Sequence, residues 1–164
     1  MWWNLKIMDS LDFAVISELM KKGRATWADL AQKVGLSAPG LMDRIRRLEE
    51  KKIIRGYKAI IDPEALGLDI LAFVSVSLEK PTHRSNFLKR IKSLSEIQEC
   101  HQITGEYDYL LKIRTINSRH LDQIVNQGIK SLAGVTRVYT SVVMGSEKET
   151  TELPLPEIEK IQSA

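Results

Sequence analysis

Segment 26–50 constrains the fold of this chain most strongly, because its residues predict two short helices joined by a glycine turn. Thr26 can accept a hydrogen bond from a free amide of the first helical turn, with Asp29 as its reciprocal partner three residues later. Gly35 supplies the left-handed residue that ends this helix, and Ser37 offers the N-cap of the next helix. The segment therefore has the outline of a helix-turn-helix, a structure that binds DNA.

The second helix of this segment is predicted to begin near Ala38, because Pro39 is tolerated in the first turn of a helix. At about 100° per residue, Leu41, Ile45 and Leu48 share one narrow sector that can pack inward. The opposite face is left free to contact DNA. Phosphate contacts are expected from Ser37 and the first amides of the helix and from the cationic side chains Arg44, Arg47 and Lys58. Pro39 is also counted among the DNA-binding residues. Base edges are expected to be reached by Met42, Asp43 and Arg46.

A further helix is predicted upstream, capped by Asp9 or Ser10 and ended by Gly23, so that three helices form a small bundle. Downstream, Ile53–Ile61 is β-branched and aromatic around a central glycine, which predicts two short strands joined by a tight turn. These strands would form the wing of a winged helix-turn-helix.

The positive charge of the chain is concentrated in the half that contains this motif. The first 68 of the 164 residues carry 12 Lys and Arg against 9 Asp and Glu, whereas the rest carry 12 of each. A charged helix face is most often only a solvated surface. Here the charged helix face coincides with the helix-turn-helix pattern, which favours contact with a phosphate backbone. The content of 43% hydrophobic and 27% charged residues is ordinary for a globular protein.

The second half of the chain predicts a strand, a helix, two strands, a helix and a strand, in that order. The expected strands are 70–78, 97–104, 109–114 and 135–144, and the expected helices are 84–94 and one that is capped by Ser118. This order is that of a ferredoxin-like βαββαβ domain, with an antiparallel sheet and both helices on one face. The fold class is therefore α+β. The expected division is a winged helix-turn-helix at 1–61, a linker at 62–69, a ferredoxin-like domain at 70–146 and a tail at 147–164.

The predicted sheet carries more apolar side chains than two short helices can cover. These side chains are Leu71, Phe73, Ile103, Leu111, Ile113, Val138, Val142 and Val143. We therefore expect a second copy of the chain on the uncovered face of the sheet. A dimer would also place two reading helices on a two-fold axis, so that they enter successive major grooves of a pseudo-palindromic site.

The order and spacing of these residues resemble the Lrp/AsnC family of transcriptional regulators over roughly residues 7 to 155. The resemblance rests on Asp9–Asp12, Val15–Leu19, Gly23-Arg24, Asp29–Ala31, Val34–Ser37, Arg44-Ile45, Leu48-Glu49, Ile54, Gly56-Tyr57 and Thr104–Asp108. It implies a regulator that binds DNA as a homodimer, often assembled further into tetramers or octamers, and that responds to an amino acid or a related small metabolite.

The segment Thr104–Asp108 has two interpretations. Judged by residue type alone, Gly105 and Asp108 favour a hairpin turn that needs unusual backbone angles. The family resemblance implies an amino-acid site instead, at a junction between dimers. There the turn amides would receive the carboxylate of the ligand and Asp108 or Thr104 its ammonium group. The expected effector-binding residues are His101, Thr104, Gly105, Glu106, Tyr107, Asp108 and Thr140.

Other classes of function find less support in the sequence. The histidines His83, His101 and His120 are scattered, and Cys100 cannot chelate jointly with its strand neighbour His101, so no metal or other cofactor is expected. No paired nucleophile and base appear, so we expect no catalysis. Two alternatives share the architecture: an enzyme similar to sirohaem decarboxylases, with His101 at its pocket, and a ligand-binding module with a vestigial DNA reader.

The expected location is the cytoplasm. The apolar opening of the chain, which includes Trp2 and Trp3, is too short for a signal peptide or a membrane span. The lone cysteine is consistent with a reducing compartment, and membranes are not an expected partner. Two prolines, Pro154 and Pro156, prevent the C-terminal tail from extending the sheet.

Overall fold

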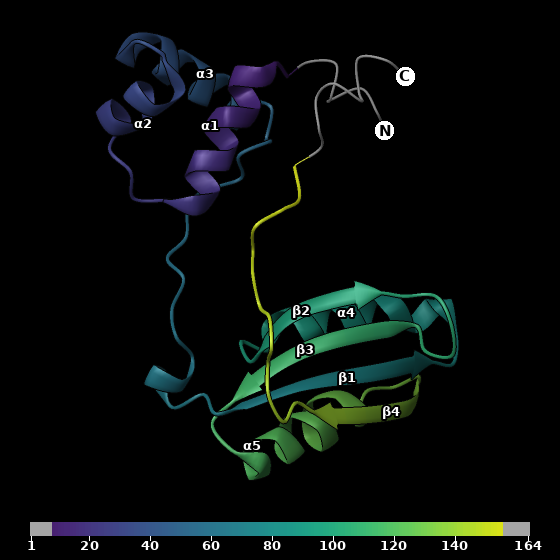
Figure 1. Ribbon diagram of the computed structural model, residues 1–164. Coiled ribbons are helices and arrows are strands. Elements are labelled where there is room, and N and C mark those ends of the chain that lie inside the picture. The colour runs from purple at the N-terminus through teal and green to yellow at the C-terminus, as the bar shows by residue number, and fades with distance from the viewer. Residues whose placement is uncertain (1–7, 156–164) are drawn as a thin grey trace. The chain divides into compact units, whose positions relative to one another are not determined.

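The computed structural model describes residues 8–155, and the chain divides into two compact units (Figure 1). Among the described residues, one unit comprises 8–60 together with 148–155, and the other comprises Ile61–Glu147. The expectations about the apolar opening with Trp2 and Trp3, and about Pro156 and the polar segment after it, lie outside the described residues. None of the helices within 8–155 is long and apolar enough to cross a membrane.

The first unit contains three helices, and a side chain caps the start of each. Asp9 accepts a hydrogen bond from the amide of Asp12, Thr26 from that of Asp29 at 3.1 Å, and Ser37 from that of Gly40 at 3.3 Å. These caps confirm the starts that were predicted from residue type. The helices are α1 (Ser10–Lys21), α2 (Trp27–Val34) and α3 (Ala38–Glu50).

The turn between α2 and α3 is formed as the sequence predicted. Gly35 has a φ of 69° and ends α2 in the left-handed conformation. The amide of Leu36 then donates to the carbonyl of Ala31 at 2.9 Å, which closes the last turn of α2. The core between the three helices is made of buried apolar side chains, namely Val15, Leu30, Ala31, Leu41, Ile45 and Leu48.

The expectation of two wing strands at Ile53–Ile61 was wrong, because the structure has no strand between residues 51 and 69. The amides of Ile53 and Ile54 both donate to the carbonyl of Leu48, so the residues expected in the first strand close the end of α3 instead. A two-stranded hairpin without further strands is at best marginally stable. Residues 55–62 run without regular structure, and Ile60 is 85% exposed.

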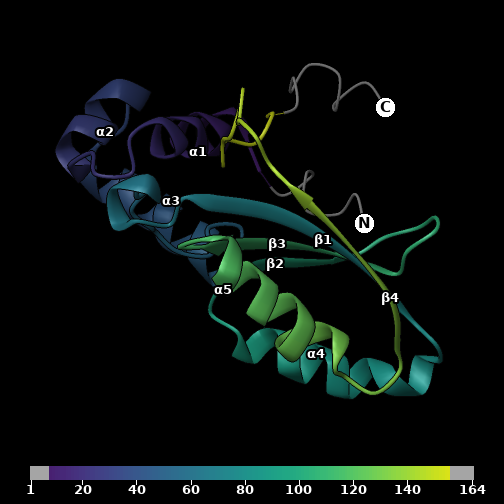
Figure 2. The ribbon, with the colours of Figure 1, turned by 90° about the horizontal axis from the view of Figure 1, so that it is seen from below.

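The second unit is a four-stranded antiparallel sheet in the order β2-β3-β1-β4, which is the βαββαβ arrangement predicted from the sequence. The strands are β1 (Ile70–Leu78), β2 (Ile97–Gln102), β3 (Tyr109–Thr115) and β4 (Val135–Val142). The helices α4 (Arg84–Ser93) and α5 (Ser118–Gln123) lie on one side of the sheet (Figure 2). A π-helix, Ile124–Lys130, continues α5, and short 3-10 turns occupy Glu64–Leu66 and Pro81–His83.

Several boundaries of the second unit differ from the predicted ones. The strand expected at 97–104 ends at Gln102, and that expected at 135–144 ends at Val142. Ser118 is the first residue of α5 rather than its cap, because Asn117 accepts the amide of His120 at 2.9 Å. Asn and Ser are both good N-caps, so residue type alone did not decide which of the adjacent Asn117 and Ser118 would cap the helix.

The strand register decides which face of the sheet each side chain occupies. Ala72, Val74 and Val76 of β1 are fully buried and pack with the helices. Leu111 and Ile113 lie opposite Val74 and Ala72, and Val138 and Val142 lie opposite Val76 and Ala72, so these four share the helix-covered face. The helices therefore face half of the eight apolar side chains that the sequence assigned to the sheet as a whole. Among the described residues the uncovered face carries Leu71, Phe73, Leu110 and Tyr139 beside charged and hydroxyl side chains.

Gly134→Ala should destabilise the second unit by about 1–3 kcal/mol. Gly134 has a φ of 84°, and an added Cβ would overlap the ring and the Cβ of His83, which lie too close to the backbone to move aside easily. Gly145 has open space around it and no such φ, so Gly145→Ala should change stability by less than about 0.5 kcal/mol. Equal denaturation midpoints for the two variants would contradict this assignment.

Candidate functional site

The outward face of α3 is open to solvent because the branched apolar side chains of the helix all turn inward. Leu41, Ile45 and Leu48 are buried, whereas Met42 is 50% exposed and Arg46 is also exposed. Pro39, Asp43 and Arg47 are likewise exposed. The first turn of the helix contains no acidic side chain, and its free amides suit an anionic ligand.

Arg46 forms an ion pair with Asp43 one turn earlier on α3, with 2.6 Å between Nη2 and Oδ1. This hydrogen bond raises the pKa of Arg46 above its ordinary value, so the guanidinium stays charged. Both side chains are more than half exposed. Because Asp43 binds one nitrogen, it limits the rotamers of Arg46 while the remaining N–H groups stay available.

Arg44 does not lie on this outward face. Its Nη1 atom is 2.7 Å from both carboxylate oxygens of Asp9 and 2.7 Å from Oδ1 of Asp12. The side chain is only 18% exposed. The phosphate contact expected of Arg44 would have to replace these two carboxylates, so the structure argues against that role.

The other expected phosphate contacts remain accessible. Arg47 is 48% exposed and only loosely paired, with Nη2 at 3.9 Å from Oδ1 of Asp12. Lys58 is exposed and forms no hydrogen bond or ion pair with any residue from 8 to 155. It follows Tyr57, whose hydroxyl donates to Glu49 at 2.9 Å and whose ring meets Trp27 edge-on. Burial and this hydrogen bond raise the pKa of Tyr57 to about 12.

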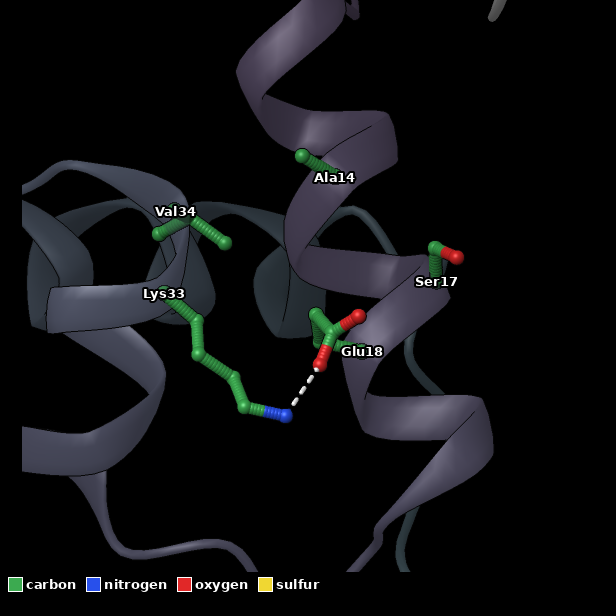
Figure 3. A pocket seen from close by; sticks show the side chains of 5 residues that line it. All are labelled: Ala14, Ser17, Glu18, Lys33 and Val34. Carbon is green, nitrogen blue, oxygen red and sulfur yellow. Dashed lines mark hydrogen bonds and ion pairs between the residues drawn. The ribbon is translucent and has the colours of Figure 1, made fainter.

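A separate pocket of about 430 Å³ lies between α1 and α2 (Figure 3). Its lining is Ala14, Ser17, Glu18, Lys33 and Val34. Glu18 and Lys33 face each other across it, with 2.8 Å between Oε2 and Nζ. None of the residues expected to bind DNA or an effector lines this pocket.

The turn at Thr104–Asp108 is formed between β2 and β3, as the hairpin interpretation predicted. Gly105 has a φ of 119°. Asp108 accepts the amide of Leu78 at 2.7 Å through Oδ2, and its own amide donates to Val76 at 3.0 Å. One oxygen of this carboxylate is therefore used to hold the turn against the end of β1.

Arg137 of β4 is a residue of this region that the sequence reasoning missed. Its guanidinium donates to the side chain of Glu106 at 2.7 Å and to the carbonyl of Glu106 at 2.8 Å, and it lies 5.0 Å from the ring centre of Tyr107. No motif signals it, because the contact depends on the register in which Arg137 lies opposite Ser77. Arg137 fixes the conformation of the turn.

The remaining expected effector residues are not gathered around the turn. His101 lies opposite Leu110 on the uncovered face and is paired with Glu99 at 3.0 Å. Thr140 lies opposite Val74, so its side chain is on the helix-covered side of the sheet. Within residues 8–155 no three His, Cys, Asp or Glu side chains are grouped so that they could hold a metal ion.

A helix-turn-helix whose second helix has an exposed polar face, together with a ferredoxin-like unit, defines a DNA-binding protein of two units. Models of known families match both parts. A model described as the Lrp/AsnC ligand binding domain matches residues 71–153, and one described as winged helix-turn-helix DNA-binding matches residues 8–55. The second match ends at Arg55, inside the segment 53–61 in which the wing strands were expected.

Relatives align over most of the chain. The leucine-responsive regulatory protein of Haemophilus influenzae is 37% identical over 152 residues, which are 92% of this chain and 92% of that protein. The proline dehydrogenase transcriptional activator of Rhizobium radiobacter is 35% identical over 145 residues, 87% of this chain and 93% of that protein. A transcriptional regulator of Neisseria meningitidis, crystallised with L-methionine, has a TM-score of 0.86 at 31% identity, covering 90% of this chain and 96% of that one.

The chain belongs to the Lrp/AsnC family of transcriptional regulators. It has the helix-turn-helix DNA-binding domain and the ligand-binding domain of that family. The resemblance inferred from the sequence is thereby confirmed. The three relatives named above are all regulators of transcription, and none of them is a decarboxylase.

Proposed function

We propose that the outward face of α3 reads DNA in the major groove. Met42, Asp43 and Arg46 reach base edges, while the Ser37 hydroxyl, the first amides of α3, Arg47 and Lys58 contact phosphates. The observation that carries this proposal is the division of α3 into a buried apolar stripe and an exposed face with Arg46 and Arg47, which the exposed cations Lys51, Lys52, Arg55 and Lys58 follow along the chain. A vestigial reader would not need to keep that face both charged and open.

Two copies of the chain form the functional unit. One reading helix covers only a half-site, and a dimer places two of them about 34 Å apart along the duplex. The uncovered face of the sheet, where Phe73 is 36% and Tyr139 59% exposed, is the surface proposed for the second copy. A protein that regulates transcription in this way acts in the cytoplasm, where the DNA is.

The second unit senses an amino acid at the turn Thr104–Asp108. Two findings support this proposal: the match to a ligand-binding domain and the L-methionine in the crystals of the Neisseria relative. The turn amides and Arg137 offer donors to a carboxylate, and the free oxygen of Asp108 offers an acceptor to an ammonium group. The decarboxylase alternative has no such support, because its candidate His101 is exposed and bound to Glu99.

Arg46→Ala should weaken binding to a specific site by about 1–3 kcal/mol and leave binding to random DNA nearly unchanged. The specific site is one that the wild-type protein selects from a random-sequence pool, and affinity is measured by gel shift at fixed salt. Arg90→Ala, on α4 of the other unit, serves as the matched control. An equal loss of affinity for both DNAs would show that Arg46 contacts the phosphate backbone and not a base.

A calorimetric screen of free amino acids should find at least one that binds the wild-type protein. Asp108→Asn keeps an oxygen for the amide of Leu78 but removes the charge, so it should weaken that binding about tenfold with little change in thermal stability. Asp122→Asn on α5 should bind as the wild type does. If no amino acid binds, or if Asp108→Asn binds unchanged, the turn is only a hairpin turn.

A further inference from the structure

The strongest ionic cluster of the helical unit joins the start of α1 to the middle of α3. At the start of α1, Asp9 accepts the amide of Asp12 at 2.9 Å and Asp12 accepts the amide of Asp9 at 3.1 Å. Both carboxylates are thus held in place by the helix end itself. The Asp12 side chain is only 8% exposed, so its charge needs a partner.

Arg44 supplies that partner from α3. One nitrogen, Nη1, bonds both oxygens of Asp9 and Oδ1 of Asp12, each at 2.7 Å. Burial raises the pKa of Asp9, but the hydrogen bonds from Arg44 and from the amide of Asp12 outweigh it and hold the pKa below its ordinary value. Asp9 and Arg44 therefore both stay ionised at neutral pH.

The direction of Arg44 separates it from the reading face. Successive residues of an α-helix are rotated by about 100°, so Arg44 and Arg46 point to nearly opposite sides of α3. A phosphate that approached Arg44 would also meet two carboxylates already bonded to it, and their charge repels an anion.

We propose that Arg44 is a positioning residue, which fixes the rotation of the reading helix through Asp9 and Asp12 and makes no contact with DNA. The inference rests on the proposed role of α3. The proposal gives Arg44 a different role from the phosphate contact that was expected from its position in the sequence. If α3 could rotate about its own axis by even a fraction of the 100° that separates successive residues, Met42, Asp43 and Arg46 would move away from their base edges.

The salt dependence of DNA binding tests this assignment, because each phosphate contact contributes about 0.9 to the slope of log K against log salt. Arg44→Ala should lower the affinity for the selected site about tenfold relative to random DNA and leave the slope unchanged. Arg47→Ala, the matched control, should reduce the slope by about one. Arg44→Lys, which keeps the charge, should restore part of the lost discrimination.

Removal of a carboxylate from this cluster should change DNA affinity in opposite directions, depending on whether Arg44 positions α3 or contacts a phosphate. Asp9→Asn retains an N-cap but weakens the hold on Arg44. It should lower site-specific affinity if Arg44 positions the helix, and raise affinity if the carboxylates merely compete with phosphate for Arg44. Circular dichroism establishes that each variant is folded at the temperature used, and Asp9→Asn carries the test should Arg44→Ala fail to fold.

Two results would overturn the proposal. A slope reduced by about one in Arg44→Ala would make Arg44 a phosphate contact. An unchanged slope with unchanged discrimination, in folded protein, would leave Arg44 a role in stability alone. Failure of α3 to read DNA is recognised separately, because either the wild type would select no site or Arg46→Ala would bind the selected site as the wild type does.

Discussion

The packing of one apolar stripe of α3 against α1 and α2 determines what the helical unit can do. Leu41, Ile45 and Leu48 are buried in the core with Val15 and Leu30. Burial of such side chains contributes roughly 1.5–3 kcal/mol each, far more than any exposed ion pair. The stripe is narrow, so it fixes one side of the helix inward and leaves the other side, with its cations, in solvent. The function of α3 follows from this division.

Ionic contacts add to the orientation that apolar packing gives α3. The stripe fixes which side of α3 faces inward to within a fraction of a turn, and the bonds from Arg44 to Asp9 and Asp12 add a directional constraint. A similar division of labour holds in the second unit. There the buried strand faces align the sheet, and Asp108 and Arg137 determine the conformation of one turn. In both units, apolar contacts supply most of the stability, and a few charged side chains orient the groups that we propose as ligand contacts.

Much of the fold could be predicted because it depends on local rules. Thr26, Gly35 and Ser37 bound their helices as residue type indicates, and the strand and helix order of the second unit follows from periodicity. The wing could not be predicted reliably, because Ile53 and Ile54 suit a strand as well as the end of α3. The contacts that Arg44 and Arg137 make within the chain could not be predicted for another reason. Their roles depend on partners 32 to 35 and 31 residues away, which spacing along one helix or strand does not reveal.

The central claim is that DNA lies against the outward face of α3, and site-specific photocrosslinking tests it most directly. The photoreactive residue p-benzoyl-phenylalanine is placed either at Met42, on that face, or at Ser17, beside the pocket between α1 and α2 (Figure 3). After irradiation with the selected DNA site, the account predicts a covalent protein–DNA adduct from position 42 and none from position 17. Adducts from position 17 and none from position 42 would contradict it.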